Sequence, residues 1–423
     1  MIRWAAIILQ NFLRTDIHYL ARGSFWLGIG RIFGALVAFG LSVLYARYLP
    51  KELYGDYRYV LSVLGALGIF ALPGVATVIT RGVARGFEGT FRRGSLLIFA
   101  SSFGVMLGGF GIAVWFFLHG NAVLGWGFIV AALFMPFAEG LGNWRAYFDG
   151  RRMFYEKTLW NIGANLFYGL SMMGAVGIIL MFSLYPWQSL IVLLGMSVLG
   201  HALPNIVAYL FAMRRVPRGA PSEQGALRYG VYLSFLDVPS TVVMYLDGIL
   251  LHAFIGPSAL AIYSFAIAAP EQMKGLMSAV AITAFPKISQ RTDTIEARQE
   301  IKKTLPAKLL RASLFTALAV AAYILAAPFL FHIFFPAYQE SVPYSQVFAL
   351  SLVFFPFGLF GTALKTEGNL KKVFGYQTAA PVAQIIFLFL LIPSFGLWGA
   401  IAGRLLGRFF ALGFEWAFFM YGK

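Results

Sequence analysis

The residues best placed to do chemistry are nine ionisable side chains inside long apolar stretches of the sequence. A charge at the centre of a membrane-spanning helix costs about 2.5–3.5 kcal/mol on insertion scales, so such residues commonly mark a ligand pathway or a buried ion pair. Cations there could bind an anionic group, and carboxylates could take up a proton or a metal cation. The nine are Arg31, Glu139, Asp237, Asp247, Glu271, Lys274, Arg404, Arg408 and Glu415.

Some of these charges have a partner on the same stretch. Glu271 and Lys274 are three residues apart and can neutralise each other on one helix face. Arg408 and Glu415 are seven residues apart, which suits a structural pair on one face. For these residues a purely structural role stands beside a functional one.

Arg31 has no acidic residue within a turn on its own stretch, so its partner must come from another helix or from a ligand. Asp237 lies 206 residues further on, an offset at which the two halves of the chain align. Two interpretations stay open. The residues form a buried pair, or Arg31 binds an anionic substrate beside a carboxylate that takes up a cation or a proton.

The elements that position these charges follow from composition. The chain has 423 residues, of which 60% are hydrophobic and 12% charged, whereas soluble proteins average about 25% charged residues. A soluble enzyme is therefore excluded, and 17% aromatic residues exclude disorder. At about 20 residues per span, the length accommodates about a dozen helices and no soluble domain. We expect an all-α integral membrane protein.

Twelve apolar runs predict twelve transmembrane helices. Central prolines in seven of the runs predict bent helices: Pro73, Pro136, Pro204, Pro239, Pro270, Pro356 and Pro381. The runs are 24–46, 57–80, 95–118, 121–146, 157–182, 187–213, 227–255, 258–285, 307–335, 341–364, 370–393 and 395–421.

Lys and Arg accumulate in alternate loops. The fourth loop holds Arg145, Arg151, Arg152 and Lys157, whereas the odd-numbered loops after the first hold neither Lys nor Arg. By the positive-inside rule, we expect both termini in the cytoplasm. The membrane that we expect for this multi-pass protein is the cytoplasmic (inner) membrane. Topology thus accounts for the net charge of +16, and no nucleic-acid partner is expected. Residues 1–20 are expected to form an uncleaved interfacial helix.

The chain divides near its midpoint. The polar stretch RRVPRGAPSEQG predicts a cytoplasmic linker at 214–226 between lobes 1–213 and 227–423, each with six helices. A weak internal repeat supports this division, because LPKELYGDY at 49–57 matches IGPSALAIY at 255–263. Six spans per half give both halves the same orientation, as in parallel-repeat transporters. We expect two six-helix lobes around a central cavity.

No catalytic pattern accompanies the charges. The chain has no Cys and five scattered His, and it lacks HExxH, GxSxG and P-loop motifs. The predicted outer loops are too short for an enzyme that acts on lipid-linked sugars outside the membrane. We therefore expect neither catalysis, nor a cofactor, nor a metal site.

The sequence resembles the polysaccharide (O-antigen type) flippases of the multidrug/oligosaccharidyl-lipid/polysaccharide exporter superfamily over essentially its whole length. One departure is Ala261, where the second motif of the family has Gly. The first motif, an "ARxLGPxxYGxY"-like turn, is carried by Ala46, Arg47, Leu49, Pro50, Tyr54, Gly55 and Tyr57. The second is carried by Asp247, Gly256, Tyr263, Ala266, Pro286 and Ser289.

The resemblance implies flipping of undecaprenyl-pyrophosphate-linked oligosaccharide by alternating access, with a polysaccharide polymerase and glycosyltransferases as partners. The guanidinium fork of Arg suits phosphate oxygens, and our candidates for the headgroup are Arg31, Lys274 and Arg404. Lipid II flippases share this layout, with cavity cations in the first and eighth spans, but have fourteen spans. For coupling to H⁺ or Na⁺ the candidates are Asp237, Asp247 and Glu271.

Alternatives of other classes remain. A cation-coupled multidrug exporter of the same superfamily would also have twelve spans, but it would favour carboxylates over the excess of cations found here. A lipid II flippase, a membrane enzyme and an envelope scaffold without transport are further alternatives.

Overall fold

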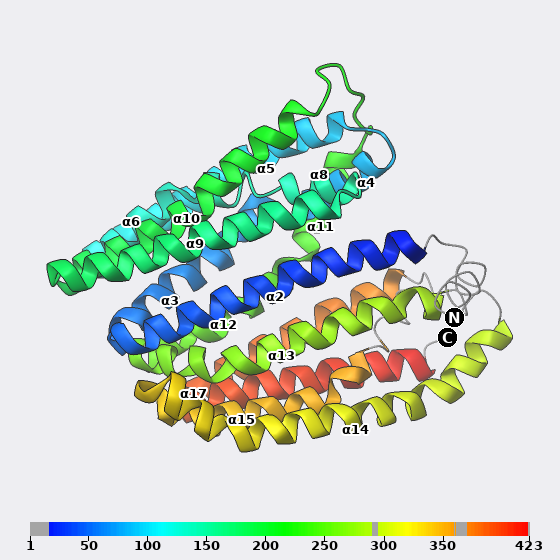
Figure 1. Ribbon diagram of the computed structural model, residues 1–423. Coiled ribbons are helices and arrows are strands. Elements are labelled where there is room, and N and C mark those ends of the chain that lie inside the picture. Colours follow the sequence, from blue (N-terminus) through cyan, green and yellow to red (C-terminus); the bar gives the residue numbers. More distant parts are fainter. Residues whose placement is uncertain (1–16, 290–294, 359, 361–369, 422–423) are drawn as a thin grey trace. The chain divides into compact units, whose positions relative to one another are not determined.

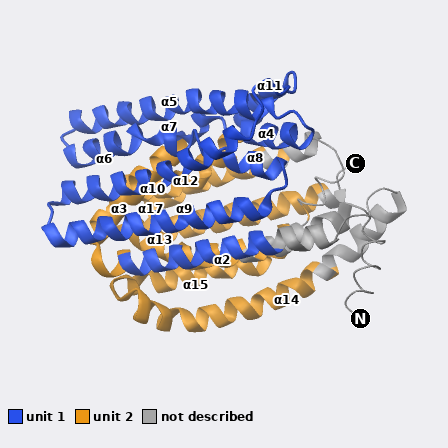
Figure 2. Ribbon diagram, turned by 45° about the horizontal axis from the view of Figure 1, so that its top comes forward, with its two compact units in different colours: residues 1–44, 67–235 blue, residues 45–66, 236–423 orange. Residues whose placement is uncertain are grey.

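The computed structural model describes residues 17–289, 295–358, 360 and 370–421 (Figure 1). Every secondary-structure element in these ranges is a helix, which confirms the all-α class. The chain forms two compact units (Figure 2): unit 1 contains residues 1–44 and 67–235, and unit 2 contains residues 45–66 and 236–423. An interfacial helix was expected at residues 1–20. Residues 1–16 lie outside the described residues, and residues 17–20 belong to α2, which begins at Ile17.

Unit 1 contains long helices and several short ones. Helix α2 runs on into the first residues of unit 2, and the gap between α10 and α11 coincides with the predicted linker. The division into lobes 1–213 and 227–423 stays a prediction.

The helices of unit 1 are α2 (Ile17–Tyr48), η1 (Gly68–Ala71), α4 (Gly74–Ala84), α5 (Gly89–Leu118), α6 (Ala122–Leu133), α7 (Met135–Ala138), α8 (Trp144–Gly150), α9 (Phe154–Phe182), α10 (Pro186–Arg214) and α11 (Ala226–Leu236).

Unit 2 is built from the second half of the sequence together with α3, which follows α2. Its helices are α3 (Lys51–Leu67), α12 (Val238–Phe254), α13 (Pro257–Ser289), α14 (Ile295–Phe334), η2 (Pro336–Ser341), α15 (Val342–Leu350), η3 (Ser351–Gly358) and α17 (Leu370–Tyr421).

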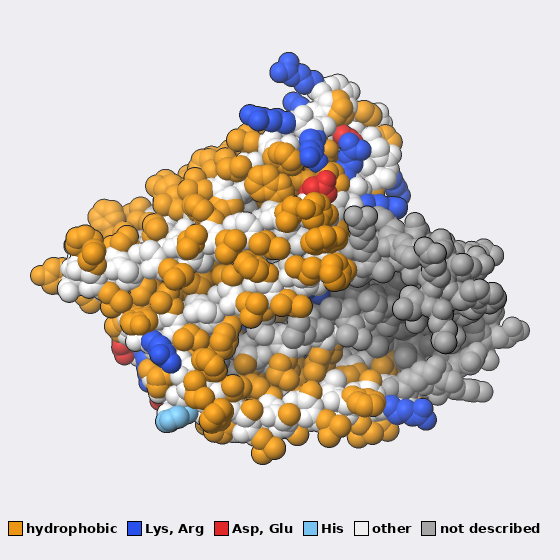
Figure 3. Space-filling model, in the orientation of Figure 1, with side chains coloured by type: hydrophobic (Ala, Val, Ile, Leu, Met, Phe, Trp, Pro, Cys, Tyr) orange, Lys and Arg blue, Asp and Glu red, His pale blue; other side chains and the backbone are white. Residues whose placement is uncertain are grey.

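The helices are long and apolar enough for a membrane. Among the described residues, seven can cross a bilayer by length and composition, and up to nine if each of two bent pairs counts as one span. These helices identify a multi-pass membrane protein, and the count of twelve spans stays a prediction. Hydrophobic side chains are the most abundant kind on the described part of the face shown in Figure 3.

Helix α17 consists of two segments. Its apolar part, Thr378–Phe418, has 41 residues and would extend about 62 Å if straight, about twice the hydrocarbon thickness. Gly396, with φ 56° and ψ −126°, reverses the chain instead. The segments then pack antiparallel, with Gly399, Gly403 and Gly407 against Leu391, Leu388 and Gln384. This turn falls where the sequence separates spans 370–393 and 395–421.

Three predicted spans are interrupted near a proline. One span is interrupted between η1 and α4, at Leu72 and Pro73, and another between α11 and α12, at Asp237 and close to Pro239. The span 121–146 breaks into α6, α7 and α8 near Pro136. Proline lacks the N–H that continues a helix, and neighbouring groups must satisfy the freed carbonyls. The helices are therefore interrupted beside Pro73, Pro136 and Pro239, three of the prolines at which the sequence predicts bending.

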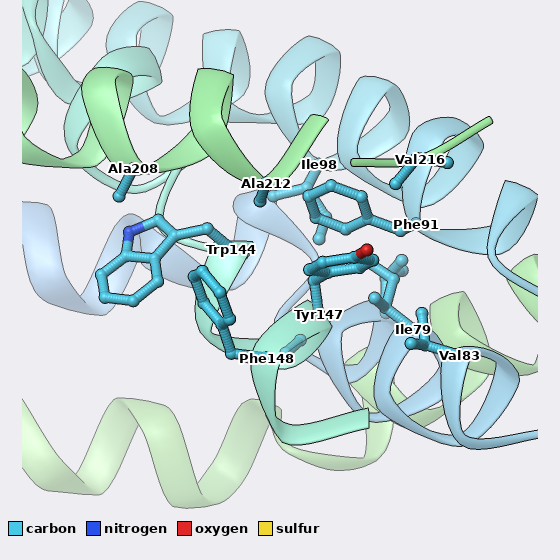
Figure 4. Packing of buried hydrophobic residues seen from close by; sticks show 12 residues of the cluster. Ile79, Val83, Phe91, Ile98, Trp144, Tyr147, Phe148, Ala208, Ala212 and Val216 are labelled. Atoms are coloured by element: carbon cyan, nitrogen blue, oxygen red, sulfur yellow. The ribbon is translucent and has the colours of Figure 1, made fainter. Parts of the chain in front are cut away.

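Aromatic residues of α8 form the core of unit 1. The side chains of Trp144, Tyr147 and Phe148 are fully buried. They pack against residues of α4, α5 and α10, among them Phe91 and Ala212 (Figure 4). This packing holds the short helix α8 firmly although it has only seven residues.

Arginines gather at the loop end of unit 1 (Figure 3). Half-buried carboxylates pair with some of them: Glu223 in the linker lies 3.2 Å from Arg81 and 3.1 Å from Arg85. Glu88 lies 3.0 Å from Arg151. The linker also bonds to α5 through the backbone, since the Gly89 N–H donates to the Pro221 carbonyl at 2.9 Å. The basic loops are therefore folded against the helices.

The two copies of the internal repeat lie side by side in unit 2. The hydroxyl of Ser258 donates to Glu52 at 2.6 Å, and these residues are 206 positions apart, the offset of the repeat. Gly55 of the first copy lies against the backbone of Pro257, so closely that a Cβ atom would clash. Contact between equivalent positions is what a two-fold axis near this turn would produce.

Candidate functional site

Five of the nine charged residues meet in unit 2, and we call them the charge cluster. Asp247 comes from α12, and Glu271 and Lys274 from α13. Arg404 and Arg408 come from the second segment of α17. Spacings of three and four residues put each pair on one face of its helix. Two consecutive helices and a third that lies far along the sequence thus contribute to one site.

Asp247 is the most deeply buried member, with 3% of the residue exposed. Its Oδ2 lies 2.6 Å from Nε of Arg404 and accepts a hydrogen bond from the hydroxyl of Tyr263. Its Oδ1 accepts the Gly248 N–H at 2.8 Å. A carboxylate in an apolar interior needs such partners to remain ionised. These contacts fix one edge of the Arg404 guanidinium.

Glu271 receives three cations. Its Oε1 lies 3.3 Å from Nη1 of Arg404 and also pairs with Nη2 of Arg408. Its Oε2 lies 3.4 Å from Nζ of Lys274. The expected pairing of Glu271 with Lys274 is therefore present, but it is one contact of three.

Both arginines have further contacts. Nη1 of Arg408 donates to Oγ of Ser351 at 2.6 Å, and its guanidinium carbon lies 4.4 Å from the ring centroid of Phe348, a cation–π distance. Nη2 of Arg404 donates to the carbonyl of Met244 at 3.4 Å. The orientation of the two guanidinium groups is thus set by several elements at once.

The cluster has an excess of positive charge, since three cations face two carboxylates. Exposure of the side chains rises from 4% at Asp247 and 13% at Arg404 to 42% at Lys274. The excess charge is therefore accessible at Lys274. The hydrophobic core of unit 2, with Leu246, Tyr263, Phe348 and Ile401, borders the cluster, and in such surroundings charges interact strongly. The arrangement suits a multiply charged anion.

The structure brings four of the six predicted site residues together: Lys274, Arg404, Asp247 and Glu271. Asp237 lies instead at the break between α11 and α12, exposed on unit 2, and it forms no ion pair with a described residue of that unit. Arg31 is exposed on α2 in unit 1, likewise without an ion pair to described residues there. The pairing of Arg31 with Asp237 stays a prediction.

The predicted site did not include Arg408 and Tyr263. Arg408 bonds to Glu271 and Ser351, and its pairing with Glu415 stays a prediction. The i, i+4 spacing of Arg404 and Arg408 on one apolar segment was the signal that could have joined them. Tyr263 belongs to the same sequence motif as Asp247, but the two residues lie on different helices, so helical spacing does not identify them as partners.

Unit 1 contains a second polar network, which we call the amide network: Asn143, Arg145, Asn161 and Asn205. The sequence pattern puts Arg145 in a loop, whereas the structure puts it half-buried in α8. Its Nε donates to Oδ1 of Asn161 at 3.1 Å and its Nη1 to Oδ1 of Asn205 at 3.3 Å.

The amide network donates hydrogen bonds to backbone carbonyls where the helix is interrupted. The Nδ2 of Asn205 donates to the Ala138 carbonyl at 2.7 Å, and the Nδ2 of Asn143 donates to the Gly140 carbonyl at 3.0 Å. These carbonyls lie at the interruption between α7 and α8, where helical partners are missing. Among the residues that the structure describes, no group of three His, Asp or Glu could hold a metal ion.

Comparisons with known proteins complete this description. A family model described as "Polysaccharide biosynthesis protein" matches residues 20–292. A search of curated proteins found no match.

Solved structures share the fold. A MATE protein in complex with MaD5 has a TM-score of 0.64 and 15% identity, with 96% of each chain covered. The lipid II flippase MurJ, in an inward closed conformation, has a TM-score of 0.65 and 12% identity over 93% of this chain and 86% of that chain. An inward-facing multidrug resistance MATE family transporter of the MOP superfamily has a TM-score of 0.59 and 16% identity, covering 91% and 93%.

At these identities the likeness is one of fold. It extends over more than nine-tenths of the chain, so the whole helical architecture is shared with known transporters and flippases. The family model covers well over half of the sequence. The protein therefore belongs to the polysaccharide biosynthesis protein family, and it is a multi-pass membrane protein with the fold of the MATE and MurJ proteins.

Proposed function

We propose that the protein flips polyprenyl-diphosphate-linked oligosaccharide across the cytoplasmic membrane by alternating access, for the synthesis of cell-surface polysaccharide. The observation that carries this proposal is the charge cluster, which places three cations and two carboxylates within an apolar helical unit. Family membership and the flippase-like fold support it.

The headgroup of such a substrate carries its negative charge on a diphosphate. Lys274 is the most exposed cation of the cluster and has one carboxylate contact, so it is the first candidate to meet the diphosphate. Arg404 lies behind it and adds charge at depth. Arg31 is the candidate from unit 1. The polyprenyl chain stays in the lipid while the headgroup crosses.

Direction would come from H⁺ or Na⁺ taken up at Asp237, Asp247 or Glu271. Asp237 is the first candidate because, unlike the other two, it has no ion pair with a described residue of unit 2. We place both termini in the cytoplasm, on the basis of the alternating loop charges. A polymerase and glycosyltransferases would work alongside the flippase.

A cation-coupled drug exporter is the second candidate, favoured by the likeness to MATE transporters. The excess positive charge of the cluster would repel a cationic drug, which makes this candidate the weaker one. Transport of a cationic dye without transport of a lipid-linked sugar would reverse this order.

The test is headgroup translocation in reconstituted vesicles. A fluorescent polyprenyl-diphosphate oligosaccharide is added to one leaflet, and its exposure on the other is followed with a membrane-impermeant quencher. We expect flipping by the unmodified protein and about tenfold slower flipping with Arg31→Ala or Lys274→Ala. Lys51→Ala removes a cation that pairs with Glu340 and should leave the rate unchanged. An inactive unmodified protein, or unimpaired Arg31→Ala and Lys274→Ala variants, would contradict the proposal.

A further inference from the structure

We infer that Glu271 is a built-in counter-ion that occupies the binding position of the substrate's diphosphate and is displaced when the diphosphate binds. The inference rests on the proposed function, because it assigns a ligand class to the same cluster. In this role Glu271 is exchanged for the substrate. A glutamate that only formed a structural ion pair would stay in place, and attraction of the substrate by the cations alone would not need a glutamate.

The first argument is convergence. Nη1 of Arg404, Nη2 of Arg408 and Nζ of Lys274 all meet the carboxylate of Glu271, two of them at the same oxygen. One ordinary ion pair would neutralise a glutamate. Three cations around a single carboxylate form a site that a more highly charged group would fill better.

The second argument is that the arginines do not depend on Glu271 for their position. Arg404 is fixed through Nε by Asp247. Arg408 is fixed through Nη1 by Ser351 and by the ring of Phe348. If Glu271 moved away, the two free guanidinium edges would still face the same place. A site that is organised before its ligand binds loses less free energy on binding.

The third argument is charge balance. With Glu271 in place the cluster carries one positive charge in excess, and without it two. A diphosphate ester carries at least two negative charges at neutral pH. If it replaced Glu271, the cluster would become neutral. If it bound beside Glu271, at least one negative charge would stay uncompensated in apolar surroundings, which is costly.

The local backbone allows Glu271 to move. Pro270 immediately precedes it within α13, and proline cannot donate the hydrogen bond that an interior helical residue makes to the carbonyl four positions earlier. The side chain of Glu271 is 31% exposed, so it has room outside the cluster. Asp247, by contrast, is enclosed and cannot serve as the displaced group.

The consequence is an opposition between affinity and turnover. In the empty protein Glu271 neutralises the cations at depth. In the loaded protein it competes with the diphosphate and speeds its release. Removing the charge of Glu271 should therefore tighten the binding of the diphosphate and slow the flipping of the substrate. If Glu271 were needed only for folding, the same substitution would weaken binding and slow flipping.

The experiment compares Glu271→Gln with Glu340→Gln, a matched loss of one carboxylate elsewhere in unit 2. Binding is measured in nanodiscs of zwitterionic lipid with farnesyl diphosphate and with inorganic pyrophosphate. We expect Glu271→Gln to bind farnesyl diphosphate about tenfold tighter than the unmodified protein and to flip several-fold more slowly. Glu340→Gln should change neither. The affinity and the flipping rate of Glu271→Asp should lie between those of the unmodified protein and those of Glu271→Gln. If Glu271→Gln does not fold, the affinity of Glu271→Asp decides whether Glu271 competes with the diphosphate.

The outcomes separate the two ideas. Flipping by the unmodified protein, combined with unchanged or weaker binding by Glu271→Gln, overturns the counter-ion alone. Tighter binding by Glu271→Gln without any flipping by the unmodified protein upholds the site and overturns the proposed function. Tighter binding of both farnesyl diphosphate and inorganic pyrophosphate by Glu271→Gln assigns the site to the diphosphate itself. A gain only when phosphatidylglycerol is the added anion assigns it to a phospholipid headgroup and overturns the inference.

Discussion

Half-buried arginines are held by different chemistry in the two units. In unit 1, Arg145 donates to neutral oxygens, those of two side-chain amides and a backbone carbonyl. In unit 2, Arg404 and Arg408 face the carboxylates of Asp247 and Glu271. Both solutions provide hydrogen-bond acceptors for a guanidinium group that is largely removed from solvent, but only the second gives it carboxylates as direct partners.

The difference indicates what each network is for. Amides can donate as well as accept, so the amide network also serves the broken backbone between α7 and α8. Carboxylates only accept, and their pairing with cations can be exchanged for pairing with another anion. The amide network therefore suits a permanent structural role, and the charge cluster suits a ligand that comes and goes.

The largest expected effect comes from Asp247→Ala. It leaves Arg404 buried without its closest carboxylate, and breaking a buried pair in this way costs about 3–5 kcal/mol. Thermal unfolding in detergent, monitored by the loss of the folded peak in size-exclusion chromatography, should show a large loss of stability. Asp247→Ala combined with Arg404→Met should recover much of it, because no unpaired charge remains. If the double variant were the less stable one, ion pairing would not be the distinguishing feature of unit 2.

A smaller effect is expected from Asn205→Ala in unit 1. Oδ1 of Asn205 accepts from Trp144 and Arg145, and its Nδ2 donates to Ala138. Leaving such neutral groups unsatisfied costs about 1–3 kcal/mol. The same unfolding measurement should place this variant between the unmodified protein and Asp247→Ala. A loss as large as that of Asp247→Ala would remove the contrast between the two networks.

The smallest effect is expected from Glu340→Ala. Glu340 pairs with Lys51, but their side chains are 51% and 31% exposed. Exposed pairs contribute about 0–1 kcal/mol and are screened by salt. The variant should unfold within a few degrees of the unmodified protein at high ionic strength. A large loss would show that carboxylate pairing stabilises unit 2 irrespective of burial.

Local features of the fold could be predicted from the sequence. Hydrophobic run length identified helices, and prolines at Pro73, Pro136 and Pro239 marked where they break. The pairing of Glu271 with Lys274 followed from helical spacing alone. Each of these features depends on residues within a few turns of one another.

The partners across helices could not be predicted in this way. Arg408 meets Glu271 from 137 positions away, and Arg404 meets Asp247 from another helix as well. Periodicity shows which residues share a face, but it does not show which helices are neighbours. Arg145, at the end of the predicted span 121–146, was counted with the charges of the fourth loop, whereas the aromatic packing of α8 leaves it half-buried. Tertiary packing overrides composition there.

The reversal at Gly396 has a consequence for sidedness. Its backbone conformation, with positive φ and strongly negative ψ, is open to glycine and disfavoured for any residue with a Cβ atom. A chain that turns back at this point leaves the bilayer on the side from which it entered. One residue without a side chain thereby fixes which compartment receives the C-terminal end. A chain that ran straight on would present that end, and anything attached to it, to the opposite compartment.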